Sequence, residues 1–413
     1  MSAAPDDWAL IFRAQFGSIL AALMMHTRDI SLAEDAIQES FLQATERWPV
    51  SGLPSSPGAW LFTVAKRRLF DLLRKSAVRH RCENNETIYT SLHDQNECPE
   101  EEFAIPEERL RLIFTCCHPA LSENARVALT LKTLCGLSVK EIARAYFSSS
   151  AAIEQRLTRA KQKIKKAGIA YEIPEGDALV ARLPSVLSVI YLIYNESYSA
   201  YEGQALTRDD FALEAIRLAR VLYRLLPHSN VGGLLALLLL HDSRRCARVS
   251  SRQCFIPLQA QDRSLWDQAL ILEGGEILNR AIAEGAADPY KIQAAISALH
   301  CEADTWEKTH WAQIELLYSS LYKLEPSPVV LLNQAVVVAN SGRVALALEL
   351  LQGLAEPLER YQPFYAARAD LAHTLGLYPQ ASSDYLRAIK LTKNCVEIAY
   401  LENQHSKLAV FLT

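Results

Sequence analysis

The segment 137–166 most constrains the fold, because its pattern is that of two helices joined by a short turn. Ser138 precedes Glu141-Ile142-Ala143 and can cap a first helix, and the serines at 148–150 offer a turn and an N-cap hydroxyl for a second. Apolar residues then recur at i, i+4, i+7 and i+11 and form one buried stripe: Ile153, Leu157, Ala160 and Ile164. The segment therefore predicts a helix-turn-helix.

The second helix of this motif is strongly basic. Between residues 152 and 167 six cations (Arg156, Arg159, Lys161, Lys163, Lys165, Lys166) stand against one acid, Glu154. Gln155, Arg156, Arg159 and Lys163 fall on the outer side, where a recognition helix enters the major groove. The sequence favours a phosphate-binding helix; a solvated basic face is the alternative.

A second basic cluster lies between Trp60 and Arg81. It holds seven Lys or Arg residues, the single acid Asp71 and the aromatic residues Trp60, Phe62 and Phe70. Cations that follow a backbone and aromatic rings that stack on bases are typical of single-strand binding. Helical spacing of the apolar residues nevertheless favours a core position for Trp60.

The helix upstream of this cluster carries an outward acidic face. Ser31 and Glu34 form a Ser-x-x-Glu capping box, and Pro49 is expected to end the helix. The inward stripe would be Ile37, Phe41, Ala44 and Trp48. Asp35, Gln38 and Glu39 then share the outer face and offer a surface for a protein partner.

Several short segments of the chain resemble a known family. The runs 33–41 (AEDAIQESF), 57–61 (PGAWL) and 67–71 (RRLFD) are similar to the second conserved region of bacterial sigma factors. The helix-turn-helix is similar to their fourth region, and the presence of only these two regions resembles the extracytoplasmic-function (ECF) class. The runs at 191–198 and 241–245, with DRSLWD at 262–267, resemble a subgroup that carries a long helical C-terminal extension.

The resemblance implies roles for individual residues. Asp35, Gln38 and Glu39 would dock on the clamp helices of the core polymerase. The minus-10 element would be bound by a first set of residues: Arg67, Arg68, Asp71, Arg74 and Lys75. The minus-35 duplex would be bound by a second set: Gln155, Arg156, Arg159 and Lys161.

The residues between the two basic parts have the opposite charge. From Cys82 to Glu108 there are nine acids and neither Lys nor Arg, which predicts an extended or disordered linker. A solvated spacer is one interpretation. The resemblance implies another, in which the acidic linker occupies the template path in the polymerase cleft.

Composition limits the remaining possibilities. A chain of 413 residues suggests two to four domains, and the net charge of −4 is uneven, because residues 1–170 hold 22 cations and 20 acids. Nine scattered cysteines without a Cys-x-x-Cys pair indicate reduced thiols and core packing for Cys116-Cys117, rather than a metal site. No signal peptide is apparent, and the longest apolar runs are shorter than the ~20 residues of a membrane span. We expect a soluble, cytoplasmic protein without cofactor, metal or membrane contact.

The C-terminal part is helical and contains a repeat. Gly342 and Gly376 are 34 residues apart, as are Ala347 and Ala381, which is the tetratricopeptide period. An earlier copy ending near residue 326 fits with a shift of about one residue, and an irregular helical bundle is the alternative. His241-Asp242-Ser243 cannot form a catalytic relay, since consecutive helical residues point ~100° apart. We expect no enzymatic activity.

These observations predict an all-α protein of five parts: a first helical bundle (1–81), an acidic linker (82–108), the helix-turn-helix domain (109–170), a helical extension (178–280) and tetratricopeptide-like repeats (281–413). The expected function is that of a sigma factor whose partners are core RNA polymerase and promoter DNA. The extension could regulate the front domains through an intramolecular contact, replace a separate inhibitor or add a polymerase contact. The alternative function is a tetratricopeptide-type regulator that binds operator DNA without polymerase.

Overall fold

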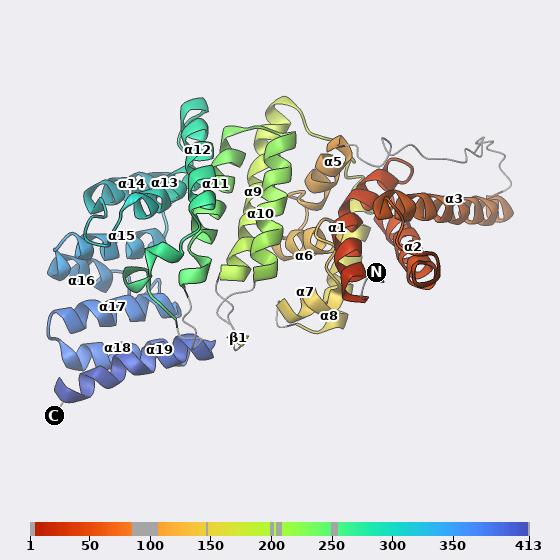
Figure 1. Ribbon diagram of the computed structural model, residues 1–413. Helices are drawn as coiled ribbons and strands as arrows, with labels where there is room; N and C mark the ends of the chain where they lie inside the picture. Colours follow the sequence, from red (N-terminus) through yellow and green to blue (C-terminus); the bar gives the residue numbers. More distant parts are fainter. Residues whose placement is uncertain are drawn as a thin grey trace. The chain divides into compact units, whose positions relative to one another are not determined.

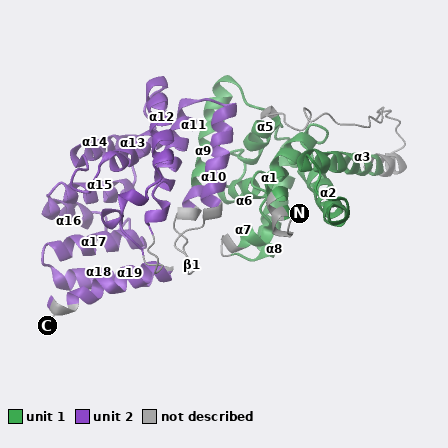
Figure 2. Cartoon of the chain, in the orientation of Figure 1, with its two compact units in different colours: residues 1–192 green, residues 193–413 purple. Residues whose placement is uncertain are grey.

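The computed structural model describes residues 5–84, 106–145, 148–198, 202–203, 209–248 and 255–411. As predicted, this part of the chain is all-α (Figure 1). Two strands of two residues each, β1 (Glu202–Gly203) and β2 (Lys393–Asn394), pair in parallel. The chain divides into two compact units, 1–192 and 193–413 (Figure 2).

Unit 1 contains the following helices: α1 (Pro5–Met24), α2 (Ile30–Ser51), α3 (Pro57–Asn84), α5 (Pro106–Cys116), α6 (Glu123–Thr133), α7 (Val139–Ala145), α8 (Ser150–Lys166) and the first part of α9 (Gly176–Tyr198). Helices α1, α2 and α3 pack on one another, and α6 and α7 pack on α8. Helix α1 also contacts α5 and α6, so it joins the first three helices to the helix-turn-helix domain.

A glycine lets α1 approach the helix-turn-helix domain. A Cβ on Gly17 would lie 2.7 Å from the Leu134 carbonyl oxygen, closer than atoms normally approach. Gly136, with φ +68°, makes the turn after α6, and a Cβ there would lie 3.0 Å from the Arg13 carbonyl oxygen. The backbones of α1 and of the 134–136 turn are therefore in direct contact.

The start of α9 is tied to α5. Arg182 Nη2 donates to the Phe114 carbonyl at 2.6 Å, and Ser185 Oγ donates to the Cys117 carbonyl at 2.6 Å. These carbonyls are at the C-terminal end of α5, where backbone acceptors have no partner within the helix. The bonds hold the first turns of α9 against the helix-turn-helix domain.

Helix α9 also corrects the expectation that no stretch is long enough to cross a bilayer. Among the described residues, Gly176–Asn195 qualifies by length and composition alone. The sequence did not indicate this length, because the apolar run Val189–Tyr194 is short. The helix extends further towards its N-terminus and includes Asp177 and Arg182. The side chains of Arg182 and Ser185 both donate hydrogen bonds to backbone carbonyls within unit 1.

Unit 2 continues with α10 (Asp209–Leu225), α11 (Ser229–Asp242), the short helices η1 (Arg245–Ala247), η2 (Leu258–Ala260) and η3 (Arg263–Leu265), and α12 (Gln268–Glu284). The repeats follow with α13 (Pro289–Glu302), α14 (Trp311–Leu324), α15 (Pro328–Asn340), α16 (Val344–Gln352), α17 (Gln362–Thr374), α18 (Tyr378–Leu391), α19 (Cys395–Lys407) and η4 (Leu408–Phe411). Helix α11 is buried from Val231 to Leu240, because α10, α12 and α13 all pack on it.

The predicted 34-residue period is confirmed. Helices α15 and α17 begin 34 residues apart, as do α16 and α18. The corresponding small residues are fully buried where the paired helices cross: Ala335 and Ala369, and Ala347 and Ala381. Gly342 and Gly376 both adopt positive φ, 87° and 74°, at the turn between the paired helices.

We expect Gly17→Ala to destabilise the contact between α1 and the helix-turn-helix domain by about 1–3 kcal/mol, because backbone atoms must move to make room. Hydrogen exchange of α1 and α6 amides should be faster in this variant. Gly275→Ala is the control, since a Cβ there meets nothing within 4 Å and the helix gains up to ~1 kcal/mol. Equal exchange in the Gly17→Ala variant and the parent chain would contradict the assignment.

Candidate nucleic-acid interface

Both helices of the predicted helix-turn-helix begin with the expected caps. Ser138 N donates to Glu141 Oε2 at 2.7 Å, and Glu141 N donates to Ser138 Oγ at 3.2 Å, which is a complete capping box. Ser149 is the N-cap of α8, and its hydroxyl accepts from Ala152 N at 3.2 Å. The local sequence therefore fixes where α7 and α8 start.

Helix α8 presents the predicted faces. The apolar stripe is buried: Ile153, Leu157, Ala160 and Ile164. Gln155 and Arg159 are exposed on the opposite side, and Arg156 is half-buried. Arg159 follows Gln155 by one turn on this open face, and Arg156 is adjacent to Gln155 in the sequence.

The remaining predicted residue of α8 lies on a different side of the helix. Lys161 is 19% exposed and forms an ion pair with Glu34 of α2, whose side chain is 6% exposed. One turn later, Lys165 Nζ lies 3.0 Å from Asp29 Oδ2. We call these two ion pairs the α2–α8 contact. In this arrangement Lys161 binds a carboxylate instead of facing outwards with Gln155.

A cavity of about 270 Å³ follows the same seam, between the N-terminus of α2 and α8. A third ion pair, between Arg13 of α1 and Glu141 of α7, connects the two halves of unit 1 on another side.

Burial alone would raise the pKa of Asp29. Lys165 and the backbone N–H groups of Ser31 and Leu32 outweigh that effect and lower the pKa.

The start and the end of α2 differ from the prediction. Asp29, and not Ser31, is the N-cap, and its carboxylate accepts from Ser31 N at 3.0 Å. A carboxylate is a strong N-cap acceptor, and Glu34 is held by Lys161 rather than by a capping box. Pro49 does not end α2, which continues to Ser51 because only the proline's own N–H bond is lost.

The inward stripe of α2 is largely confirmed. Ile37, Ala44 and Trp48 are buried, and Phe41 is half-buried and stacked on Phe12 with ring centroids 4.4 Å apart. On the other side Asp35 and Gln38 are exposed and Glu39 is half-buried. These three residues form an accessible patch on the same helix that holds Glu34.

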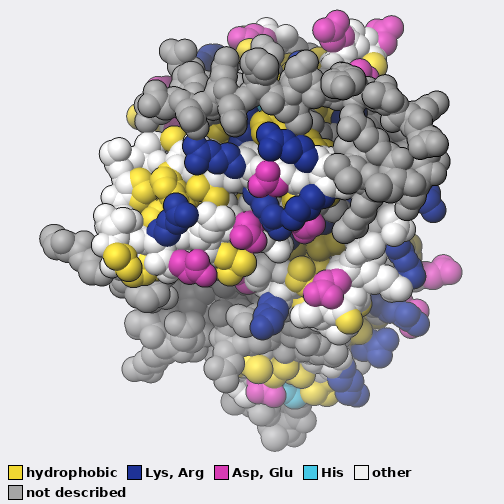
Figure 3. Space-filling view, turned by 90° about the vertical axis from the view of Figure 1, so that its right-hand side faces the viewer, with side chains coloured by type: hydrophobic (Ala, Val, Ile, Leu, Met, Phe, Trp, Pro, Cys, Tyr) yellow, Lys and Arg dark blue, Asp and Glu magenta, His cyan; other side chains and the backbone are white. Residues whose placement is uncertain are grey.

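The basic residues of α3 lie on its open side. Arg67, Arg74 and Lys75 are exposed and Arg68 is half-buried. Asp71 is 3.9 Å from Arg74, and both side chains are 55% exposed. Figure 3 views the side on which α2 and α3 lie, and Lys and Arg side chains are interspersed there with Asp and Glu. The side chains of Arg79 and Arg81 lie outside the described residues.

Trp60 is half-buried rather than part of the fully closed core. Its ring packs edge-on against Trp48, with centroids 5.5 Å apart. Phe62 and Leu61 beside it are fully buried. The aromatic residues of this segment therefore serve mainly to attach α3 to α2.

Most of the predicted acidic linker lies outside the described residues, which exclude 85–105. Its two ends are helical instead of extended, because α3 continues to Asn84 and α5 begins at Pro106. Glu108 is buried and pairs with Arg111 at 2.9 Å, one turn further along α5. Arg111, which lies just beyond the acidic run, therefore pairs with Glu108, the last acid of that run.

Cys116, the last residue of α5, and Cys117 after it are buried. Cys116 Sγ lies 3.2 Å from Thr133 Oγ1, and Cys117 Sγ lies 3.6 Å from Thr130 Oγ1. Both hydroxyls belong to α6, so the thiols pack between two helices. Burial raises the pKa of Cys117 to about 11, which keeps this thiol protonated at neutral pH.

Three family profiles match successive parts of the chain. Sigma-70 region 2 matches residues 14–79, from α1 to α3, and Sigma-70 region 4 matches residues 111–164, from α5 to α8. A family of unknown function matches residues 182–282, from α9 to α12. The order of the matches is the order of the two basic parts and the extension.

Individual proteins are similar to different lengths of the chain. An uncharacterized protein of Rhizobium meliloti is 39% identical over 398 residues, which are 94% of this chain and 93% of that protein. The ECF RNA polymerase sigma factor SigM of Bacillus subtilis is 30% identical over 158 residues, 38% of this chain and 91% of SigM. The probable RNA polymerase sigma factor RfaY of Xanthomonas campestris is 29% identical over 152 residues, 36% of this chain and 37% of RfaY.

The ion pair between Asp29 and Lys165 predicts a titration. In the folded chain the Asp29 carboxyl should titrate below its ordinary value of 3.8. The pair then adds stability above that value and loses it as the pH falls through the lowered pKa. Lys165→Gln should raise the titration midpoint of Asp29, because the lysine no longer offsets the effect of burial, which raises the pKa. Lys166→Gln removes an exposed neighbouring charge and should leave the midpoint unchanged. Carboxyl NMR measures this, and an identical midpoint in both variants would refute the pairing.

Proposed function

This chain belongs to the ECF family of RNA polymerase sigma factors, and we propose that it directs core polymerase to promoters and helps to open them. Its work is recognition, through phosphate attraction and contacts to base edges. The protein acts in the cytoplasm, without cofactor or metal. The helical C-terminal part serves as a regulatory or interaction domain.

The assignment of residues follows the three open faces of unit 1. Asp35, Gln38 and Glu39 on α2 bind core polymerase. The open side of α3 binds the minus-10 element: Arg67, Arg68, Asp71, Arg74 and Lys75. The open face of α8 binds the minus-35 duplex through Gln155, Arg156 and Arg159. The observation that carries the proposal is that these exposed faces lie on α2, α3 and α8, within the two segments that match sigma-70 regions.

The α2–α8 contact has a consequence for promoter binding. The minus-10 and minus-35 elements are 25 base pairs apart, about 85 Å of duplex at 3.4 Å per step. Helix α3 packs along α2, and its 28 residues span only about 42 Å. While Lys161 is bound to Glu34, α3 and α8 are too close to occupy both elements.

We therefore propose that the described arrangement is the unbound state and that the α2–α8 contact breaks on promoter binding. Lys161 becomes available to a phosphate only after that separation. The extension contributes through α9, whose Arg182 and Ser185 bind the end of α5 and stabilise the helix-turn-helix domain in this position. This is regulation within one chain, and it opposes DNA binding until polymerase supplies the energy of separation.

The polymerase assignment predicts separate effects on core and on DNA. Replacing Asp35, Gln38 and Glu39 together by alanine should weaken binding to purified core polymerase at least tenfold and abolish run-off transcription. Binding of the unbound chain to duplex DNA should stay the same, because α3 and α8 are intact. Glu46→Ala, an exposed acid on the same helix, is the control.

The outcome separates the two candidate functions. An operator-binding regulator has no use for this face of α2, so full promoter activity of the triple variant would exclude the polymerase role. A library of random promoter sequences serves as the template for run-off transcription and as the duplex in the DNA-binding measurement.

The α2–α8 contact predicts that one conservative substitution increases DNA affinity. Glu34→Gln keeps the shape of the side chain but removes the partner of Lys161, at a cost of about 1–2 kcal/mol to the closed state, between the values for exposed and buried pairs. Affinity of the unbound chain for duplex DNA should rise about 5- to 30-fold. Glu46→Gln removes the same charge from an exposed position and controls for net charge. Equal affinities of the two variants would contradict the closed state.

A further inference from the structure

The chain between α8 and α9 forms a strap, residues 168–175, that is neither helix nor strand. Gly168, with φ +58°, ends α8, and Ile169 N donates back to the Ile164 carbonyl at 3.1 Å, as in a Schellman turn. Beyond this turn exposed residues alternate with half-buried ones: Ile169, Tyr171 and Ile173. This alternation is that of an extended chain with one side against the protein.

Tyr171 of the strap contacts two helices that are far apart in the sequence. Its hydroxyl donates to the Glu108 carbonyl of α5 at 3.0 Å and to the Ala21 carbonyl of α1 at 3.3 Å. Ala21 is one of the last residues of α1, whose carbonyls have no partner within the helix. Burial and the nearby Glu108 carboxylate raise the pKa of Tyr171, so its hydroxyl remains a donor at neutral pH.

The two carbonyls belong to the two halves of unit 1. Ala21 lies in the segment that matches Sigma-70 region 2, and α5 overlaps the start of the segment that matches region 4. Tyr171 lies outside both matches, and it also precedes the third match, which starts at residue 182. A hydroxyl of the strap thus joins the two sigma segments without belonging to either of them.

The strap and the start of α9 are held mainly on the helix-turn-helix side. Arg182 and Ser185 bind the carbonyls at the end of α5, and Arg126 of α6 donates to Ser185 Oγ. Separation of α2 from α8 would leave the strap on this domain. It would break the contact between Tyr171 and Ala21.

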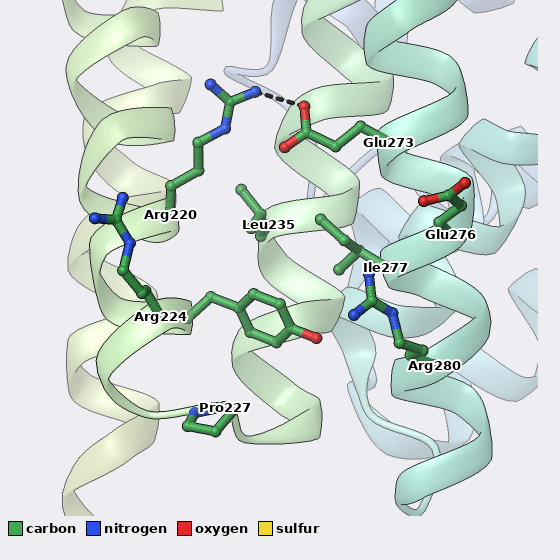
Figure 4. Close-up of a pocket in the computed structure, with 9 residues that line it drawn as sticks. Arg220, Arg224, Pro227, Leu235, Glu273, Glu276, Ile277 and Arg280 are labelled. Atoms are coloured by element: carbon green, nitrogen blue, oxygen red, sulfur yellow. Dashed lines mark hydrogen bonds and ion pairs between the residues drawn. The ribbon is translucent and has the colours of Figure 1, made fainter.

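Unit 2 offers a comparison for the strength of such a bridge. Arg220 of α10 and Glu273 of α12 form an ion pair of 2.6 Å beside a cavity of about 510 Å³ (Figure 4). Their side chains are 43% and 40% exposed, and an ion pair that water screens in this way contributes little. The loss of the Tyr171 hydroxyl leaves the Ala21 carbonyl without its donor in a partly buried place. Breaking the strap contact therefore costs at least as much as breaking this ion pair.

We propose that Tyr171 is a latch, through which the segment after α8 restrains the separation of the two sigma segments until core polymerase and promoter bind. This role rests on the proposed closed state of the unbound chain. It assigns part of the restraint to a residue outside the sigma-70 matches. The bond between Tyr171 and Ala21 breaks together with the α2–α8 contact.

Tyr171→Phe in the full chain tests the latch, because it removes the hydroxyl and keeps the ring. Affinity of the unbound chain for duplex DNA should rise about 3- to 10-fold, the factor for loss of one neutral hydrogen bond from the closed state. Tyr322→Phe, which removes the hydroxyl of an exposed tyrosine in α14, should leave the affinity unchanged. In the Glu34→Gln background Tyr171→Phe should raise the affinity further, until the closed state is no longer the major one.

The outcomes separate the latch from the closed state itself. Unchanged affinity in Tyr171→Phe, together with the expected rise in Glu34→Gln, overturns the latch and leaves the closed state intact. Unchanged affinity in both variants contradicts the closed state, and the latch with it. A lower unfolding temperature of Tyr171→Phe without higher DNA affinity shows a merely structural bond, which also overturns the latch.

Discussion

The ion pair between Lys161 and Glu34 joins the two segments of this protein that match sigma-70 regions. The two residues are 127 positions apart in the chain, and their side chains are only 19% and 6% exposed. Because a partly buried charge is costly without its partner, the pair favours the arrangement in which α8 lies against α2. Under the proposed function, recognition of a promoter competes with this contact inside the chain.

The two units of the chain stabilise themselves in different ways. In unit 1, specific contacts between separated segments join its two halves, such as Arg13 with Glu141 and Gly17 with Leu134. In unit 2, helices α15 to α18 form stacked pairs in which small buried residues recur every 34 positions. A few ion pairs can be exchanged for contacts with a partner, whereas a continuous stacked core cannot. Unit 1 is thus the part suited to rearrange.

Features with a local or periodic origin could be predicted from the sequence. The caps at Ser138 and Ser149, the buried stripe of α8 and the spacing of Gly342 and Gly376 follow from neighbouring residues or from a repeat. The start of α2 was misplaced because Asp29 and Ser31 are both good cap residues. The partners of Lys161, Lys165 and Arg220 had no sequence signal, since they lie 127, 136 and 53 residues away.

The separation of α2 and α8 tests the central claim most directly. Spin labels introduced as non-natural residues at Glu46 and Lys166, both exposed, allow pulsed electron resonance to measure it in the unbound chain and in the promoter complex with core polymerase. The account predicts a single short distance in the unbound chain and an increase of tens of ångströms in the complex. The same distance in both states, or a long distance in the unbound chain, would contradict it.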